Sequence, residues 1–303
     1  MIIKQLKTWN RRRLEARKRQ KCGIPHLEIQ VQELQNVLSP PNPTTAAQIA
    51  IGLLAQSASP AQIHASLQAI RQACLALSAN SQGVIYIAST RTGDWLDEQL
   101  SPAPFQMRCV QIPDNTKRST AENFLLKEAA ATGFTHYISM SADGLPEPGA
   151  IKNLVQMSIA ANDGALIEAV LFPDELPKYF NPQTLDTDWV SMTCLLIPAQ
   201  IYQTIGGFDE DFHHLGADID YSWRARSMGF KTKTCPTALY FQSPGSESRL
   251  EMACAIDKAQ CASLLASKWQ GPTKRKTGDA FDAQRSPEIA SFKFENQYAL
   301  NRW

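Results

Sequence analysis

Two stretches of the sequence place carboxylates where they could do chemistry. One is Ser141-Ala142-Asp143-Gly144, directly after an apolar segment, and the other runs from residue 206 to residue 220 and includes Asp218 and Asp220. A carboxylate can hold a hard divalent cation, and a well-placed one can remove the proton of a hydroxyl nucleophile. The alternative is local, because aspartate also favours turns and helix N-termini. One aspartate at a helix N-terminus can both cap the helix and act as a base.

Other kinds of catalytic site are not indicated. The sequence has no Walker loop, no GxGxxG turn and no GxSxG elbow. Its seven cysteines include no CxxC pair, so a zinc site is not indicated either. Their odd number and irregular spacing are typical of reduced, buried thiols in a cytoplasmic protein.

Alternating strand and helix patterns must position the first stretch. Short apolar runs predict strands, and apolar residues at helical spacing after a capping box predict helices. The expected elements are strands at 48–54, 83–87, 107–112 and 134–140, a helix opened by Ser59 and Gln62, and a helix opened by Ser119 and Glu122 that runs to Ala131. This order predicts an α/β fold with a mostly parallel central sheet flanked by helices. Ligands of such sheets bind beyond the carboxyl ends of the strands, where Asp143 falls.

The second stretch lies between further elements. Residues 189–198 predict a strand, residues 218–226 predict a helix that stops at Gly229, and residues 246–267 predict another helix. Pro148 suits the first turn of a helix that follows Asp143. A nucleotidyltransferase of similar topology would carry a glycine-rich basic loop after its first strand. Residues 56–59 contain neither glycine nor a basic side chain, so that class ranks last.

On these motifs the chain resembles glycosyltransferase family 2, the nucleotide-sugar-dependent enzymes of GT-A fold. The resemblance covers roughly residues 47–245 and implies a single GT-A-like domain. The residues that carry it are Asp143 with residues 146–150 (the family's DxD strand end), residues 188–196 ("dWvsGacLLi"), residues 206–210 with 218–220 ("GGFDE…eDvDl"), residues 223–226 with Gly229 ("sWRaRlaGy"), Asn115 with residues 121–123 ("N…ARN"), and residues 268–271 ("KWgG").

The resemblance implies an inverting sugar transfer. An acceptor hydroxyl attacks the anomeric carbon while the nucleoside diphosphate leaves, and by similarity Asp218 takes the hydroxyl proton. A divalent Mn or Mg ion held by Asp143 would offset the charge of the leaving diphosphate. By similarity, the nucleotide-sugar donor would contact Ser89, Asn115, Lys117, Ser141 and Asp143, and a glycan or lipid-linked acceptor would contact Trp189 and Asp220.

Some of these residues also have a local explanation. Lys117 and Arg118 could meet a diphosphate, or they could solvate the start of a helix. Trp189 and Trp223 could stack on a sugar ring, or they could pack in the core. Both alternatives stay open for each pair at this stage.

The chain departs from the family pattern mainly where donor and metal would bind. The departures are Ser141 at the first acid of DxD, Ala217 at the acid before Asp218, no aspartate at Ala88-Ser89, Met192 at a glycine, and Phe241 or Gln242 at a histidine. A hard-metal site depends on the summed charge of its ligands, so each lost acid or histidine weakens it. Two alternatives follow: an enzyme that binds metal mainly through the diphosphate, or a degenerate GT-A domain that acts as a binding or interaction module.

Composition and charge set the remaining expectations. The chain has 303 residues with 44% hydrophobic and 19% charged side chains, enough to bury a core, and no apolar run long enough to span a membrane. Residues 1–21 hold nine basic side chains and one acid, so this arm is net +8 within a chain of net +1.

The arm predicts an anionic partner such as a membrane surface, or a solvated tail, and not a nucleic acid. We expect an arm and linker at 1–43, a GT-A domain at 44–245, a helix and polar tail at 246–303, and a cytoplasmic location at the inner face of the membrane in cell-surface polysaccharide synthesis.

Overall fold

The computed structural model describes residues 47–56, 58–77, 81–90, 105–114, 116–172, 178–212, 215–242 and 255–269. The chain divides into two units, Met1–Thr44 and Thr45–Trp303, and every described residue belongs to the second. The basic arm, Asn115 and the polar tail lie outside the described residues, so the interpretations that concern them stay predictions. In the part of the chain that is described, no helix is both long enough and apolar enough to cross a lipid bilayer.

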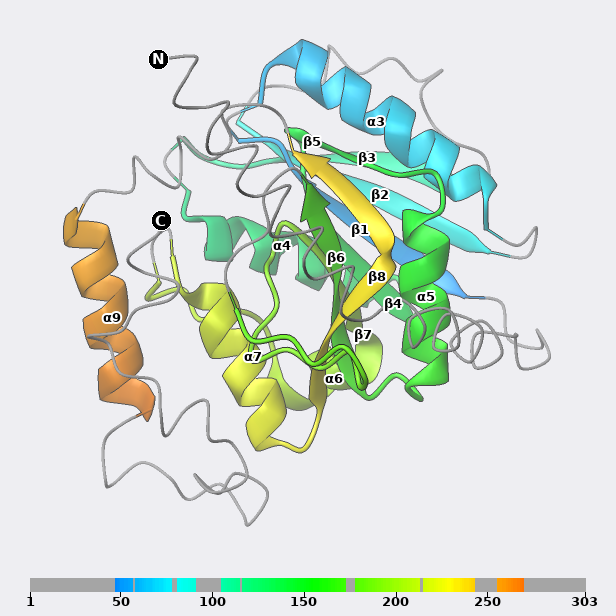
Figure 1. Ribbon diagram of the computed structural model, residues 1–303. Helices are drawn as coiled ribbons and strands as arrows, with labels where there is room; N and C mark the ends of the chain where they lie inside the picture. The colour runs from blue at the N-terminus through cyan, green and yellow to red at the C-terminus, as the bar shows by residue number, and fades with distance from the viewer. Residues whose placement is uncertain are drawn as a thin grey trace, which may run out of the picture. The chain divides into compact units, whose positions relative to one another are not determined.

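The described strands form one mixed sheet of eight strands that curls through the domain (Figure 1). The strands are β1 (Gln48–Leu54), β2 (Gln82–Ser89), β3 (Phe105–Gln111), β4 (His136–Ser141), β5 (Gly144–Pro146), β6 (Ala165–Phe172), β7 (Cys194–Pro198) and β8 (Lys231–Gln242). Their order across the sheet is β3-β2-β1-β4-β7-β6-β8-β5. The pairs β1–β2, β2–β3, β1–β4 and β6–β8 are parallel, while β7 runs antiparallel to both β4 and β6. The prediction of an α/β fold with a mostly parallel sheet is confirmed.

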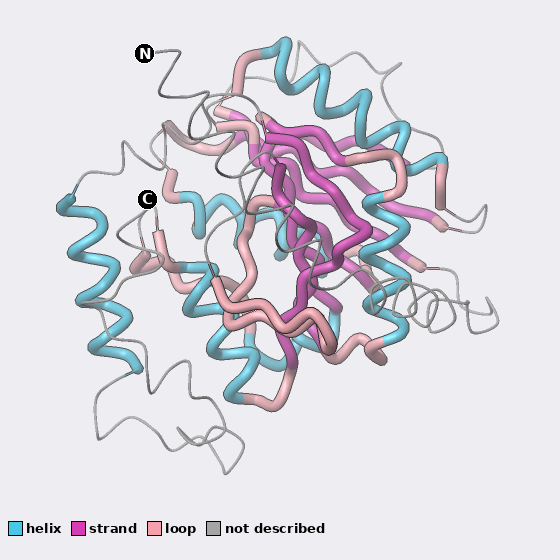
Figure 2. The backbone as a smooth tube through the Cα atoms, viewed as in Figure 1, coloured by secondary structure: helices cyan, strands magenta, loops and turns pink. Residues whose placement is uncertain are grey.

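Helices cover both faces of the sheet (Figures 1 and 2). The described helices are α3 (Pro60–Leu75), α4 (Arg118–Ala131), α5 (Ala150–Ala160), α6 (Ala199–Ile205), α7 (Ala217–Ser227) and α9 (Ala255–Trp269). Helices α3 and α5 contact each other on one face. Residues of α4, α6, α7 and α9 share one buried hydrophobic cluster on the other. This hydrophobic cluster packs against α7, the helix that carries Asp218.

The start of α3 agrees with the sequence prediction, whereas the start of α4 does not. Ser59 and Gln62 form the predicted capping box, with hydrogen bonds of 2.9 and 3.3 Å. The predicted box of Ser119 and Glu122 is wrong, because α4 begins at Arg118 and both side chains point inward. Ser119 Oγ donates to the Phe212 carbonyl (3.0 Å), and Glu122 accepts from the Tyr137 hydroxyl (2.7 Å).

The segment before β7 is also shorter in strand than predicted. Only Cys194–Pro198 forms the strand, while residues 189–193 form an irregular turn. Side chains satisfy the backbone of this turn in place of a strand ladder: Val190 N donates to Ser222 Oγ (3.0 Å), and Ser191 N donates to Glu168 Oε2 (2.8 Å). The turn is thereby held against α7 and β6. One helix start also differs, because α5 begins at Ala150 rather than at Pro148. Of the helix expected at 246–267, residues 246–254 lie outside the described residues, and α9 (Ala255–Trp269) is the described part.

Candidate functional site

The carboxyl ends of β1, β2 and β4 meet at one edge of the sheet. Leu54, the last residue of β1, pairs with Ala88 of β2 and with Ser141 of β4. Ser89 and Ser141 therefore end neighbouring strands on either side of β1, and Asp143 follows in the turn after β4. The sequence placed these residues at a ligand-binding edge, and the structure brings them to the same edge.

The turn of residues 191–193 brings Asp218 to this edge. Thr193 O accepts a hydrogen bond from Ser141 N (3.1 Å), so the turn lies directly beside the end of β4. Asp218 stands in the first turn of α7, where its carboxylate accepts from the backbone N–H groups of Met192 and of Ile219 (3.0 Å for Ile219). The N-cap of α7 is Gly216, with φ of +90°, a conformation that strains other residues. Gly216 thus sets the direction in which the helix presents Asp218.

The surroundings of Asp218 make its carboxylate a stronger base. Burial raises its pKa above the ordinary value of 3.8, and the charges of Arg118 and Lys178, together with the two backbone N–H groups, only partly offset that effect. The side chain still reaches solvent in part. A carboxylate with a raised pKa that remains accessible has the properties of a general base.

Arg118 is the cation beside Asp218 and Ser141. Its Nη2 donates to Ser141 Oγ (2.9 Å) and to the Met192 carbonyl (3.3 Å). Lys117, which the sequence suggested as a donor contact, instead reaches Glu210 O (2.8 Å) on the other side of the helix start. Consecutive helical residues point about 100° apart, so Arg118 faces the edge in this arrangement, and the expected donor contact of Lys117 stays a prediction.

A second buried cation was missed by sequence analysis. Lys178 forms an ion pair with Glu168 of β6, which is 2% exposed and also accepts from Ser191 N (2.8 Å) and Thr234 Oγ1 (2.6 Å). The signal in the sequence was a single charged residue inside an otherwise apolar strand, because a charge is buried there only when it is paired.

Trp189 is buried in the core of the domain. It is 3% exposed, and the ammonium of Lys178 lies 4.7 Å from the centre of its ring. The ring is packed in the core in this arrangement, which agrees with the packing alternative, and the expected contact of Trp189 with an acceptor stays a prediction.

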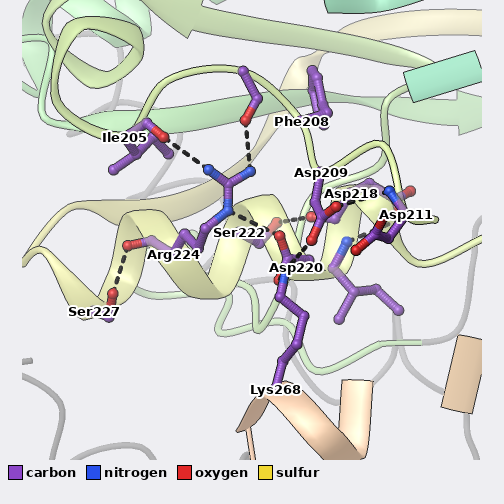
Figure 3. A network of polar contacts seen from close by, with 12 residues as sticks. Ile205, Phe208, Asp209, Asp211, Asp218, Asp220, Ser222, Arg224, Ser227 and Lys268 are labelled. Atoms are coloured by element: carbon purple, nitrogen blue, oxygen red, sulfur yellow. Dashed lines mark hydrogen bonds and ion pairs between the residues drawn. The ribbon is translucent and has the colours of Figure 1, made fainter. Parts of the chain in front are cut away.

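Asp220 is likewise structural. It is fully buried, and each of its carboxylate oxygens is bonded: Oδ2 accepts from Arg224 Nε (2.9 Å), and Oδ1 accepts from Lys268 Nζ (2.9 Å) and Trp269 Nε1 (3.1 Å). Figure 3 shows Lys268 reaching from α9 toward Asp220 and Asp209. Both oxygens of Asp220 are thus bonded within the domain, and its expected contact with an acceptor stays a prediction.

The acid-rich turn before α7 is held by side chains from two helices. Arg224 of α7 donates to the carbonyls of Ile205 (2.8 Å) and Gly207 (2.7 Å), as Figure 3 shows for this arginine. Asn123 of α4 donates to Phe208 O (2.9 Å) and accepts from Phe208 N (2.7 Å). The turn therefore positions α7, and with it Asp218, relative to α4 and Arg118.

The residues at the edge do not fit a metal ion held by the protein alone. Asp143 is the one carboxylate in the segment from Ser141 to Gly144, and the Ser141 hydroxyl is engaged by Arg118. Within the described ranges, no group of three or more His, Cys, Asp or Glu side chains is placed to hold a metal. The prediction of a cation site built on Asp143 thus lacks the further ligands that hard cations require.

Comparisons with known proteins bear on the fold. No protein-family model matches the chain. No curated protein matches it either. Solved structures do match: GalNAc-T7 with UDP, GalNAc and Mn²⁺ aligns at a TM-score of 0.58 with 10% identity, over 84% of this chain and 53% of that one.

Two further structures agree. The mannosyltransferase PcManGT from Pyrobaculum calidifontis, in complex with GDP-Man and Mn²⁺, aligns at a TM-score of 0.57 with 15% identity, over 88% of this chain and 75% of that one. TarS from S. aureus aligns at 0.52 with 9% identity, over 84% of this chain and 44% of that one. The chain spans about half the length of GalNAc-T7 and less than half of TarS. With its strand order and helix placement, the chain has a GT-A-like glycosyltransferase fold.

Proposed function

We propose that this chain is an inverting glycosyltransferase that moves a sugar from a nucleoside-diphosphate donor to a hydroxyl group of its acceptor. The observation that carries the proposal is Asp218. It is a partly exposed carboxylate of raised pKa, held by Met192 and Ile219 at the carboxyl edge of the sheet. Solved structures of this fold with UDP and GDP-Man add support at the level of the fold.

The proposed reaction is a direct displacement. The acceptor oxygen forms a bond to the anomeric carbon as the bond from that carbon to the diphosphate oxygen breaks. Asp218 takes the acceptor proton, and the electron pair of the broken bond leaves with the diphosphate. Attack from the side opposite the leaving group inverts the anomeric configuration. Because the acceptor site is unassigned, its chemical class is part of the proposal: a glycan or a lipid-linked sugar, in the synthesis of cell-surface polysaccharide.

Two of the solved structures contain Mn²⁺. When bound with a donor, such an ion neutralises diphosphate charge. In this chain we expect Asp143 to contact such an ion, and the described side chains are too few to hold it without the diphosphate. The proposed steps therefore use only the chain's own residues.

The alternative is a GT-A domain that binds a glycan or a partner without turnover. The observation that favours it is the end of β4, where Ser141 stands bonded to Arg118 and an acid is missing. The test is a panel of UDP-, GDP- and dTDP-sugars incubated with the full chain, with and without Mn²⁺, while release of nucleoside diphosphate is measured. The proposal expects release from one class of donor. No release from any donor, with binding of a glycan retained, would favour the alternative.

The location is proposed from the sequence alone. Residues 1–21 carry net +8, and each lysine or arginine near an anionic membrane contributes about 1 kcal/mol of attraction. We expect the full chain to sediment with anionic vesicles at low salt and to be released at high salt, because salt shortens the range of the attraction. A variant lacking residues 1–43 should stay in solution under both conditions. Equal sedimentation of the two proteins would contradict a membrane role for the arm.

A further inference from the structure

The positive charge beside Asp218 belongs to the side chain of Arg118, which makes no close ion pair within the described ranges. None of the ion pairs among the described residues includes Arg118. Lys178, the other cation whose charge acts on Asp218, is paired with Glu168. The guanidinium of Arg118 is thus free of a close ion pair in the described part of the chain, although its charge acts on Asp218, whereas Lys178 and Glu168 largely cancel each other's charge.

The hydrogen bonds of Arg118 fix the guanidinium through Nη2 but do not involve Nε. Both bonds leave from Nη2, toward Ser141 Oγ and the Met192 carbonyl. Nε is buried and has no hydrogen-bond partner among the described residues. A buried donor without a partner is costly and rare, so the described protein contacts of Arg118 leave part of its hydrogen-bonding capacity unused. Guanidinium groups match the paired oxygens of phosphates especially well.

The start of α4, the helix that carries Arg118, also favours an anion. Arg118 is the first residue of α4, and no side chain caps that end of the helix. The free backbone N–H groups of a helix start favour an anion there, in the same direction as the guanidinium charge. Arg118 is held beside Ser141 at the end of β4, which is the edge that Asp218 also reaches.

We propose that Arg118 binds the diphosphate of the donor directly and offsets the charge of the leaving group, in place of a divalent cation held by the protein. This inference rests on the proposed function and deepens it. The acids that would hold a metal are too few among the described residues, and the arginine stands where their charge would be needed. The chain would then bind a nucleoside diphosphate without added metal.

The experiment measures binding rather than turnover. UDP, GDP and dTDP are titrated calorimetrically into the full chain, first with EDTA and then with Mn²⁺. The same titrations are made on Arg118→Gln, on Arg118→Lys and on a matched control, Arg71→Gln, whose arginine lies exposed on α3. Thermal unfolding of each variant confirms that it is folded, and Arg118→Lys retains the charge if Arg118→Gln does not fold.

We expect one diphosphate to bind in EDTA, and Arg118→Gln to weaken that binding about tenfold to a hundredfold, the worth of one charge-assisted hydrogen bond. Arg118→Lys should lose less, and Arg71→Gln should bind like the unaltered chain. Inorganic pyrophosphate should show the same loss, whereas the corresponding nucleoside should not, because a general distortion of the edge would affect both.

Two results would overturn the inference while leaving the proposed function in place. One is equal affinity of Arg118→Gln and Arg71→Gln. The other is binding that requires Mn²⁺ and disappears in Asp143→Ala, which would assign the charge to a metal. If no diphosphate binds with EDTA or with Mn²⁺, the proposed function fails and this inference fails with it.

Discussion

Asp220 and the end of β4 lie in neighbouring parts of the molecule, yet their polar groups are treated in opposite ways. Both oxygens of Asp220 are bonded, to Arg224, Lys268 and Trp269. Near the end of β4, Arg118 Nε is buried without a hydrogen-bond partner among the described residues. A buried carboxylate whose oxygens are all bonded is compatible with a stable fold. An unpaired polar group at a strand edge lowers stability, and a bound molecule could supply its missing partner.

The network around Asp220 and the end of β4 therefore have different roles. The network around Asp220 fixes the position of α7 and so of Asp218, two residues earlier. At the end of β4, Arg118 retains its charge and has hydrogen-bond donors that the described residues do not use. Changes in the first part should therefore alter stability most, and changes at the second part should alter ligand binding most, with Asp218 as the residue where the two meet.

The largest effect is expected from Asp218→Asn. Loss of a general base lowers turnover by about a hundredfold to ten-thousandfold, while folding and diphosphate binding should change little. Because the base must be unprotonated and its pKa is raised above 3.8, turnover of the unaltered chain should fall on the acid side at a pH above that value. The measurement is the initial rate of diphosphate release against pH. Asp211→Asn, which alters an exposed side chain nearby, is the control. Similar rates in the two variants would remove Asp218 from the mechanism.

Asp220→Ala should cost the most stability. It leaves Arg224 and Lys268 without their shared partner, and breaking a buried ion pair costs about 3–5 kcal/mol. The lower end of that range applies, since both cations are about a quarter exposed. The measurement is urea unfolding. Asp209→Ala removes only the more exposed partner of Lys268 and should cost about 1 kcal/mol or less. Equal losses would mean that the network is not centred on Asp220.

Glu122→Gln should raise stability at high pH. Burial raises the pKa of Glu122 from an ordinary 4.5 to about 7, against the opposing effects of Tyr137, Arg118 and Ser139. Between those two pH values the folded chain keeps a proton that the unfolded chain has lost, so stability falls as pH rises through this window. Glutamine cannot ionise and can still accept from the Tyr137 hydroxyl.

The variant should therefore match the unaltered chain near pH 4 and exceed it by up to about 3 kcal/mol above pH 7. Unfolding by urea at several pH values makes the comparison, with the exposed Glu128→Gln of the same helix as control. A constant difference across pH would show that Glu122 titrates normally in the folded chain.

Ser141→Ala should have the smallest effect. It removes one of the two acceptors that hold Arg118 Nη2, and a hydrogen bond to a charged group contributes about 1.5–3 kcal/mol at most. Because the Met192 carbonyl and water can still accept, we expect a loss near or below the lower limit, and less than a tenfold loss of diphosphate affinity. Thermal unfolding and calorimetry check both. A loss of affinity as large as that of Arg118→Gln would mean that Ser141 itself holds the ligand.

Local patterns located β1 to β4 and the helix that carries Asp218, but not β5, β6 or β8, nor the groups around Asp218. Strand-sized apolar runs and the capping box at Ser59 located β1 and α3 correctly. The related Ser-x-x-Glu pattern failed at Ser119, because Ser119 bonds to Phe212 and Glu122 bonds to Tyr137, neither of which belongs to α4.

The charges of the site were harder still to predict. Whether Lys117 or Arg118 faces the edge depends on the rotation of α4, which no spacing in the sequence determines. Lys178 and Glu168 lie ten residues apart in the sequence, and no local spacing predicts that they form an ion pair. The raised pKa of Asp218 results from burial, which is a property of the packed domain rather than of its motif.

The most direct test is a structure of the full chain with the nucleoside diphosphate that binds it, prepared in EDTA. We expect the diphosphate at the carboxyl edge of β1, β2 and β4, with its oxygens within hydrogen-bond distance of Arg118. Asp218 should lie on the side from which an acceptor reaches the sugar. A nucleotide bound away from this edge, or one separated from Asp218 by the core of the domain, would contradict the account.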